Sequence, residues 1–265
     1  MPAHLKRAKL NDKCTTFALK MYFKSLDWSW YLYYVLVGDI MKAFGLYLIL
    51  SLLTGNPFLA LILLLLIFFI VERRFIGILP DIFKPWRRKN RARLLQKELK
   101  LNPANADVCL ELGESYFRQG KYSQAISYLK QAAGKLAGHP LFHFYLGASY
   151  YYLGRNGQGE EELKKAISEN PRVSFGEPYL YLLMIYLQEK QPEEKVTPVF
   201  DQLIRYGSPK TFYRAGKLFL SNQDRERARL LFRETIDNYE ICRGALRRYY
   251  RKWAILSKLA LLSNK

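Results

Sequence analysis

The feature that most constrains this chain is a small-residue pair that recurs through its second half. Leu112-Gly113 and Leu146-Gly147 stand 34 residues apart, and Ala215-Gly216 follows 69 residues after the second pair. A glycine lets two helices approach closely, whereas a single helix pair buries too little apolar surface to be stable alone. The spacing therefore predicts an all-α fold in which successive helix pairs stack and share one core.

Further positions recur when the units are aligned on this pair. Tyr116, Ala125 and Leu129 in a unit that starts at Ala106 correspond to Tyr150, Gly159 and Leu163 in one from Pro140, and to Phe219, Ala228 and Phe232 in one from Pro209. On these residues the segment resembles the tetratricopeptide repeat (TPR) family. The resemblance implies an α-solenoid over 106–240 with about four helix pairs, near 106–139, 140–173, 177–208 and 209–240. The third unit lacks the glycine, and its place follows mainly from the spacing.

Helices are also predicted at both ends of the solenoid. The polybasic segment 81–105 contains a helix over residues 91–101 that would cover the first unit. The segment 241–265 is predicted to be a basic capping helix, with apolar side chains at helical spacing: Ala245, Leu246, Tyr249, Trp253, Leu256, Leu259 and Ala260.

The first part of the chain is predicted to be a membrane helical hairpin over 31–80, preceded by a basic amphipathic segment over 1–30. Fourteen consecutive apolar residues, 58–71, follow the turn signal Thr54-Gly55-Asn56-Pro57. That run spans only about 21 Å, against about 30 Å of hydrocarbon core. A spanning hairpin, a shallow hairpin in one leaflet and a buried hairpin of a soluble protein all remain open. The apolar region begins too late and runs too long for a cleaved signal peptide.

Basic residues flank the apolar region and dominate the net charge of +19. By the positive-inside rule, they predict an integral membrane protein with both termini and the TPR domain in the cytoplasm. A lipid-headgroup role is predicted for a set around residues 73–93: Arg73, Arg74, Lys84, Trp86, Arg87, Arg88, Lys89, Arg91 and Arg93.

The TPR resemblance also implies a concave groove lined by the first helix of each unit. The groove residues expected to bind a peptide are Phe117, Phe144, Tyr151, Tyr152, Tyr213 and Lys217. Leu110 and Glu114 stand where some family members carry Lys and Asn that grip a C-terminal carboxylate, which disfavours that mode. Occupation of the groove by the chain's own last helix is the alternative.

Catalytic and metal-binding patterns are not found in the sequence. His139 and His143 lack further ligands nearby, and Cys14, Cys109 and Cys242 lie far apart. We therefore expect no enzyme activity, no metal ion and no cofactor. The function expected is a membrane-anchored TPR scaffold that binds a protein partner at the cytoplasmic face and helps assemble a membrane complex. The alternative is a nucleic-acid-binding adaptor that uses the basic segments 84–100 and 243–265.

Overall fold

The computed structural model describes residues 41–71 and 84–263, and every regular element in these ranges is a helix. The chain divides into two compact units, Met1–Arg74 and Phe75–Lys265. The expected amphipathic segment 1–30, residues 31–40 and 72–80 of the expected hairpin, and with them Arg73 and Arg74, lie outside the described residues.

The described part of the first unit consists of two apolar helices joined by a tight turn. One helix runs through residues 41–54 and the other is α2 (Pro57–Val71). The turn forms because Gly55 adopts a positive φ of 63° and the Asn56 side chain accepts a hydrogen bond of 2.9 Å from the Phe58 amide. Pro57 then suits the first helical position, where no amide donor is needed.

Large apolar side chains of this unit face solvent around the turn. Leu52 is 85%, Leu53 78% and Phe58 78% exposed. Yet α2 has 15 residues and rises only about 22 Å. None of the helices within residues 41–71 and 84–263 combines the length and the apolar composition needed to cross a membrane.

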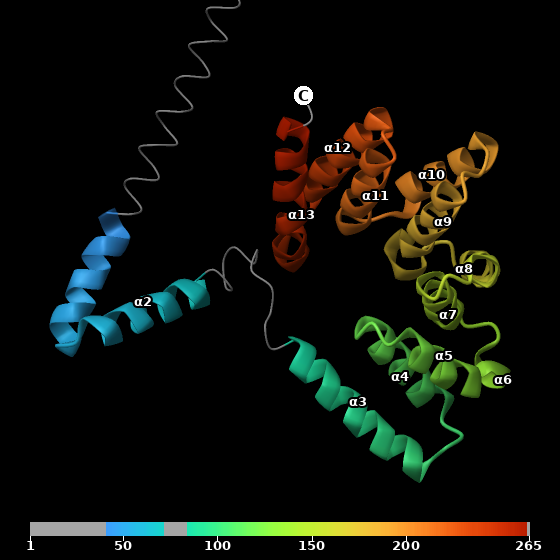
Figure 1. The fold of residues 1–265 in the computed structure, drawn as a ribbon, viewed down its shortest axis with the longest axis horizontal. Coiled ribbons are helices and arrows are strands. Elements are labelled where there is room, and N and C mark those ends of the chain that lie inside the picture. The colour runs from blue at the N-terminus through green and yellow to red at the C-terminus, as the bar shows by residue number, and fades with distance from the viewer. Residues whose placement is uncertain (1–40, 72–83, 264–265) are drawn as a thin grey trace, which may run out of the picture. The chain divides into compact units, whose positions relative to one another are not determined.

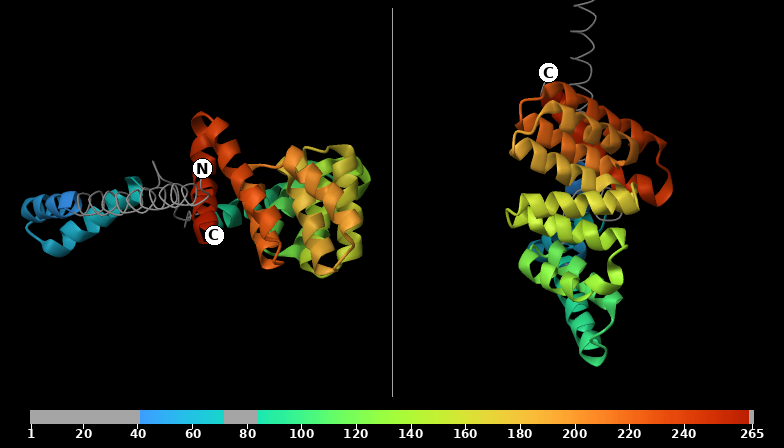
Figure 2. Two further views of the ribbon diagram at one scale, coloured as in Figure 1. Left: turned by 90° about the horizontal axis from the view of Figure 1, so that it is seen from above. Right: turned by 90° about the vertical axis from the view of Figure 1, so that its right-hand side faces the viewer.

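The described part of the second unit begins with α3 (Lys84–Leu101) and continues as four helix pairs. These are α4 (Ala106–Arg118) with α5 (Tyr122–Gln131), α7 (Pro140–Tyr152) with α8 (Asn156–Glu169), α9 (Glu177–Gln188) with α10 (Glu193–Tyr206), and α11 (Pro209–Ser221) with α12 (Arg225–Ile241). The short helix α6 (Ala133–Leu136) and the turn η2 (Val173–Gly176) lie between pairs, and α13 (Gly244–Ser263) follows the last pair. Figures 1 and 2 show the pairs stacked in chain order, so the predicted all-α solenoid is confirmed.

Left-handed residues in the tight turns allow the two helices of each pair to double back. The turn residue is Gly120 (φ 77°) in the first pair and Gly154 (φ 73°) in the second. Lys190 (φ 52°) and Gln223 (φ 65°) take the same conformation in the third and fourth pairs, although side chains disfavour it. The turn conformation therefore persists in the third and fourth pairs although the turn glycine does not.

The third pair departs from the 34-residue spacing. Its first helix begins at Glu177, 37 residues after Pro140 and 32 before Pro209. The extra residues form η2, where Ser174, Phe175 and Gly176 are all left-handed. Leu183 and Met184 stand where the other pairs have their small-residue pair, so α9 carries no glycine opposite α10.

The helices α3 and α13 pack against the two ends of the solenoid. Ala92 and Leu95 of α3 are buried in a small core with Val108, Leu112 and Tyr116 of α4. On α13, the buried residues are Tyr250, Ala254 and Ser257. The predicted packing stripe of α13 is therefore partly wrong, since Leu246, Tyr249 and Leu259 are each more than half exposed.

Candidate partner-binding surface

An aromatic cluster connects the first three helix pairs. Phe117 of α4 lies between Tyr152 of α7 and Tyr181 of α9, with ring centroids 6.1 and 6.5 Å away. Tyr122, at the start of α5, stacks on Tyr152 at 4.3 Å with an interplanar angle of 8°. Tyr151 also meets Tyr181 at 5.8 Å. Such ring contacts add stability beyond area burial and hold the side chains in fixed positions.

Exposure separates the cluster into a floor and an accessible surface. Tyr181 is only 3% exposed, so it belongs to the floor. Tyr152 is 43% exposed, while Phe117, Tyr122 and Tyr151 are half-buried. We call the exposed and half-buried rings, Phe117, Tyr122, Tyr151 and Tyr152, the aromatic surface.

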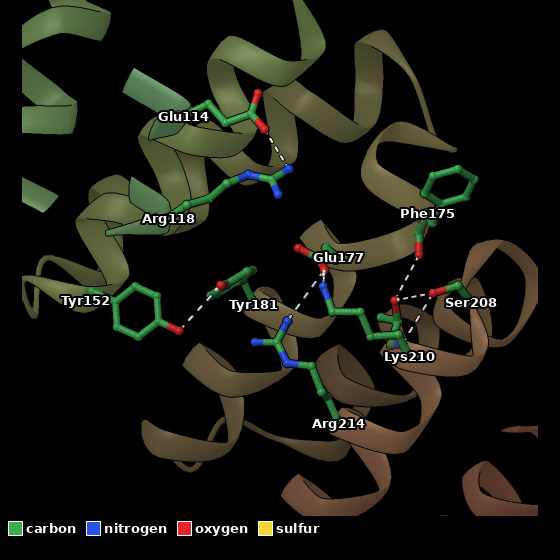
Figure 3. A network of polar contacts seen from close by, with 10 residues as sticks. Glu114, Arg118, Tyr152, Phe175, Glu177, Tyr181, Ser208, Lys210 and Arg214 are labelled. Carbon is green, nitrogen blue, oxygen red and sulfur yellow. Dashed lines mark hydrogen bonds and ion pairs between the residues drawn. The ribbon is translucent and has the colours of Figure 1, made fainter. Parts of the chain in front are cut away.

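A network of charges adjoins the aromatic surface. Glu177 of α9 pairs with Lys210 of α11 at 2.6 Å and with Arg214 at 3.7 Å. The Arg214 guanidinium also lies 5.6 Å from the centre of the Tyr181 ring. Figure 3 shows Lys210 and Arg214 directed at Glu177, and the Tyr152 hydroxyl directed at that of Tyr181, 3.5 Å away. The network therefore couples α7, α9 and α11.

A second ion pair lies on α4. Arg118 contacts Glu114 at 2.6 Å, one helical turn away. Burial, followed by the negative charge of Glu114, raises the pKa of Tyr145 beside this pair, whereas Arg118 opposes the rise. Burial likewise raises the pKa of Tyr181, although Arg214 opposes the rise. Both phenols are thus neutral at physiological pH, and the charge here comes from the arginines, lysines and glutamates.

The structure brings together only part of the groove expected from the sequence. Tyr152 and Lys217 are exposed, and Phe117, Tyr151 and Tyr213 are half-buried. Phe144 is a correction, because it is 1% exposed and lies in the core. Its ring is covered by Phe117 and Tyr181, at centroid distances of 6.4 and 5.9 Å.

The last helix reaches one end of the expected groove. Trp253 of α13 contacts Tyr213 with ring centroids 5.4 Å apart. Tyr152 nevertheless keeps 43% of its surface exposed. Within the described residues, α13 thus covers Tyr213 and leaves the aromatic surface around Tyr152 accessible.

Residues of this site that were not predicted include Tyr122, Glu177, Tyr181 and Arg214. A signal for Tyr181 existed, since it is the fifth residue of a unit that starts at Glu177. That is the position at which Tyr213 was chosen in the fourth unit. The irregular spacing around η2 hid this register.

The basic residues expected to face lipid divide between two environments. Arg88 donates a hydrogen bond of 2.9 Å to the Arg118 carbonyl, and Arg91 pairs with Glu111 at 2.6 Å. These two arginines therefore bind α4. Trp86 is 64% exposed. Arg87, Lys89 and Arg93 are also exposed, and the Lys84 side chain lies outside the described residues.

No group of three His, Cys, Asp or Glu residues within 41–71 and 84–263 could hold a metal ion. His143 is buried, with Nδ1 2.6 Å from the Glu162 carboxylate and Nε2 2.6 Å from the Ala137 carbonyl oxygen. Both ring nitrogens are thus engaged in contacts that hold α7 in place.

These features define a TPR-like α-solenoid whose aromatic and cationic surface is formed by first helices of its pairs together with Tyr122 of α5. A family model described as tetratricopeptide repeat matches residues 92–146, from within α3 to within α7. The TPR assignment made from the sequence is supported by this match and by solved TPR structures.

Known proteins resemble parts of this chain. The structure of TTC0263, a thermophilic TPR protein in Thermus thermophilus, has a TM-score of 0.52 and 18% identity, covering 68% of this chain and 94% of that one. YrrB, described as a TPR protein with an unusual peptide-binding site, has a TM-score of 0.43 and 18% identity, covering 65% and 84% of the two chains. At these identities the TTC0263 likeness shows the fold alone.

A curated relative is similar over a shorter stretch. The BBSome complex member BBS4 homolog of Drosophila melanogaster is 26% identical over 115 residues, which are 39% of this chain. The match covers 23% of that protein, so this chain spans less than a quarter of the relative's length.

Proposed function

We propose that this protein is a membrane-anchored TPR scaffold that binds a segment of a partner protein on its aromatic surface. The observation that carries the proposal is the set of rings on α4, α5 and α7, held by one another and by Tyr181, with Tyr152 43% exposed. Trp and Tyr are enriched among the few residues that carry most of the binding energy at protein interfaces, and rigid aromatic side chains bury a large area with little loss of conformational freedom. Similarity to a member of a multiprotein complex also supports a role in complex assembly.

The charges beside the rings favour an acidic partner segment. Arg118 is paired with Glu114, and Glu177 serves both Lys210 and Arg214. Lys217, two turns along α11 from Lys210, is exposed. Positive charge is thus in excess over these residues, and a segment with an aromatic or aliphatic anchor next to Asp or Glu would complement it.

A site-specific crosslinking experiment tests the partner-binding surface. A photoreactive amino acid in place of Tyr152 should capture a defined protein in the native cells, and Lys217→Glu should weaken that capture by reversing the charge. The matched crosslinking control replaces Gln158, an exposed residue on α8. Identical products from positions 152 and 158 would refute the proposed surface.

The proposed anchor is the apolar pair of helices in residues 41–71. Leu52, Leu53 and Phe58 expose most of their side-chain surface at the turn, and such a concentration of apolar area is costly in water. Insertion of the turn into a bilayer would remove that cost, either across the bilayer or within one leaflet. The basic residues after the hairpin favour the membrane orientation in which the solenoid and both termini lie in the cytoplasm.

Membrane attachment is tested by extracting native membranes with alkaline carbonate. We expect the full chain to stay with the lipid pellet, while Leu52→Asp combined with Leu53→Asp shifts it to the supernatant. Release of the unmodified chain would refute integral insertion. It would not bear on the proposed partner-binding surface, which the crosslinking experiment tests separately.

A further inference from the structure

A pocket of about 630 Å³ lies between α3 and α5, apart from the aromatic surface. Its walls combine three basic side chains with three neutral polar ones: Arg93, Lys97, Lys100, Gln96, Tyr128 and Gln131. The rest of the wall is apolar, from Leu99 and Pro103. None of the described residues that line it is acidic. Pockets of this size hold small organic molecules.

The three basic residues occupy one side of α3, because they are spaced by four and three residues. All three are exposed, and none forms an ion pair with another described residue. Arg91, on another side of the same helix, is instead paired with Glu111. Three basic residues of α3 that form no ion pair with α4 are therefore gathered at the pocket.

Neutral donors complete the polar lining. The Gln96 amide donates to the Tyr116 hydroxyl oxygen at 2.6 Å and to that of Tyr128 at 3.3 Å. Tyr128 is held further by stacking on Tyr116, with centroids 5.2 Å apart and an interplanar angle of 6°. Since the Tyr128 oxygen accepts from Gln96, its own O–H proton can be donated to a molecule in the pocket.

We propose that this pocket binds a phosphate monoester carried on a small organic group. A phosphate dianion has several acceptor oxygens, which Arg93, Lys97, Lys100 and the Tyr128 hydroxyl would satisfy with charge-assisted and neutral hydrogen bonds. The pocket is larger than a bare phosphate requires, and the apolar wall at Leu99 and Pro103 suits the carbon atoms of the carrier. The phosphate belongs either to a free small molecule or to the head group of an anionic lipid.

The test uses the full chain in a nonionic detergent, titrated in a calorimeter with two probes. Glycerol 3-phosphate represents the free phosphate monoester, and dihexanoyl phosphatidic acid carries the same group on a short lipid. Binding of both probes with equal affinity supports a free small molecule as the source. Tighter binding of the phosphatidic acid supports a lipid head group. Failure of both probes to bind overturns the proposal.

Charge-neutralising variants separate the pocket from general attraction to a basic protein. Lys97→Gln and Arg93→Gln should each weaken probe binding about threefold to fivefold, the range of one partly solvated charge pair. Tyr128→Phe should weaken it about fivefold through the loss of one hydrogen bond. The matched control is Lys258→Gln, which removes one exposed charge from α13. We expect wild-type affinity from it, and a loss equal to that of Lys97→Gln would overturn the proposal.

Discussion

The contact between Gly147 of α7 and Gly159 of α8 gives a stringent test of how the helix pairs hold together. A methyl group at Gly147 would lie 2.9 Å from the Gly159 carbonyl oxygen and 3.0 Å from the Leu163 amide nitrogen. Both are backbone atoms, which cannot rotate away as a side chain can. Gly147→Ala therefore forces α7 and α8 apart.

The expected magnitude follows from two opposing effects. Overpacking a well-ordered contact costs about 1–3 kcal/mol, and the rigid backbone neighbours place this site near the upper end. Alanine has the higher helix propensity, so replacing glycine within a helix stabilises that helix by about 1 kcal/mol. The free energy of unfolding should thus fall by about 2 kcal/mol, which lowers the melting temperature by about 4–8 °C.

Thermal unfolding of the full chain, followed by circular dichroism at 222 nm, measures the effect. The matched control is Gly157→Ala in the first turn of α8, where an added methyl group meets no atom within 4 Å. That variant should melt at or slightly above the wild-type temperature. If Gly147→Ala were as stable as Gly157→Ala, close backbone contact would not be the reason for the repeated glycine.

Three further outcomes are expected. Leu163→Ala removes a completely buried side chain and should lower the free energy of unfolding, measured with urea, by about 2–5 kcal/mol. A much smaller decrease would contradict the place of Leu163 in the core. Asn105→Ala removes the side-chain oxygen that accepts a hydrogen bond from the Val108 amide. It should lower the free energy of unfolding by about 1 kcal/mol in the same assay, whereas Asn105→Asp, which keeps an acceptor oxygen, should change it little. Because burial raises the pKa of Tyr145, the folded state holds this proton longer than the unfolded chain does, so stability should fall as the pH rises above about 10. Tyr145→Phe should make that fall shallower when unfolding is compared at pH 9 and 11, and an unchanged slope would refute this origin.

The repeat could be predicted because close packing leaves a trace in the residue type. Gly113, Gly147 and Gly216 all lie where an added methyl group would meet the partner helix. The third pair leaves no such trace, since Leu183 and Met184 stand there and η2 displaces its start. Its helices form because the neighbouring pairs bury them, which local sequence does not report.

The aromatic surface was predictable only in part for a similar reason. Helical spacing places Tyr151 and Tyr152 at the end of α7, but it does not tell which rings other helices will cover. Phe144 is buried by Phe117 and Tyr181, residues 27 and 37 positions away in the chain. Exposure at such positions depends on how consecutive pairs are stacked.

The sequence by itself determined the class of fold, the helix pairs and the presence of a basic segment before them. Helical periodicity, recurring glycines and runs of basic residues can all be recognised within a short stretch of sequence. Only the tertiary structure decided how the basic side chains are used. Arg91 pairs with Glu111 of the next helix, while Arg93, two residues later, lines a pocket. Helical periodicity alone shows that the side chains of Arg91 and Arg93 point in different directions. Which of them meets an acidic residue depends on where α4 and α5 cross α3, and the packing of the whole stack sets that crossing.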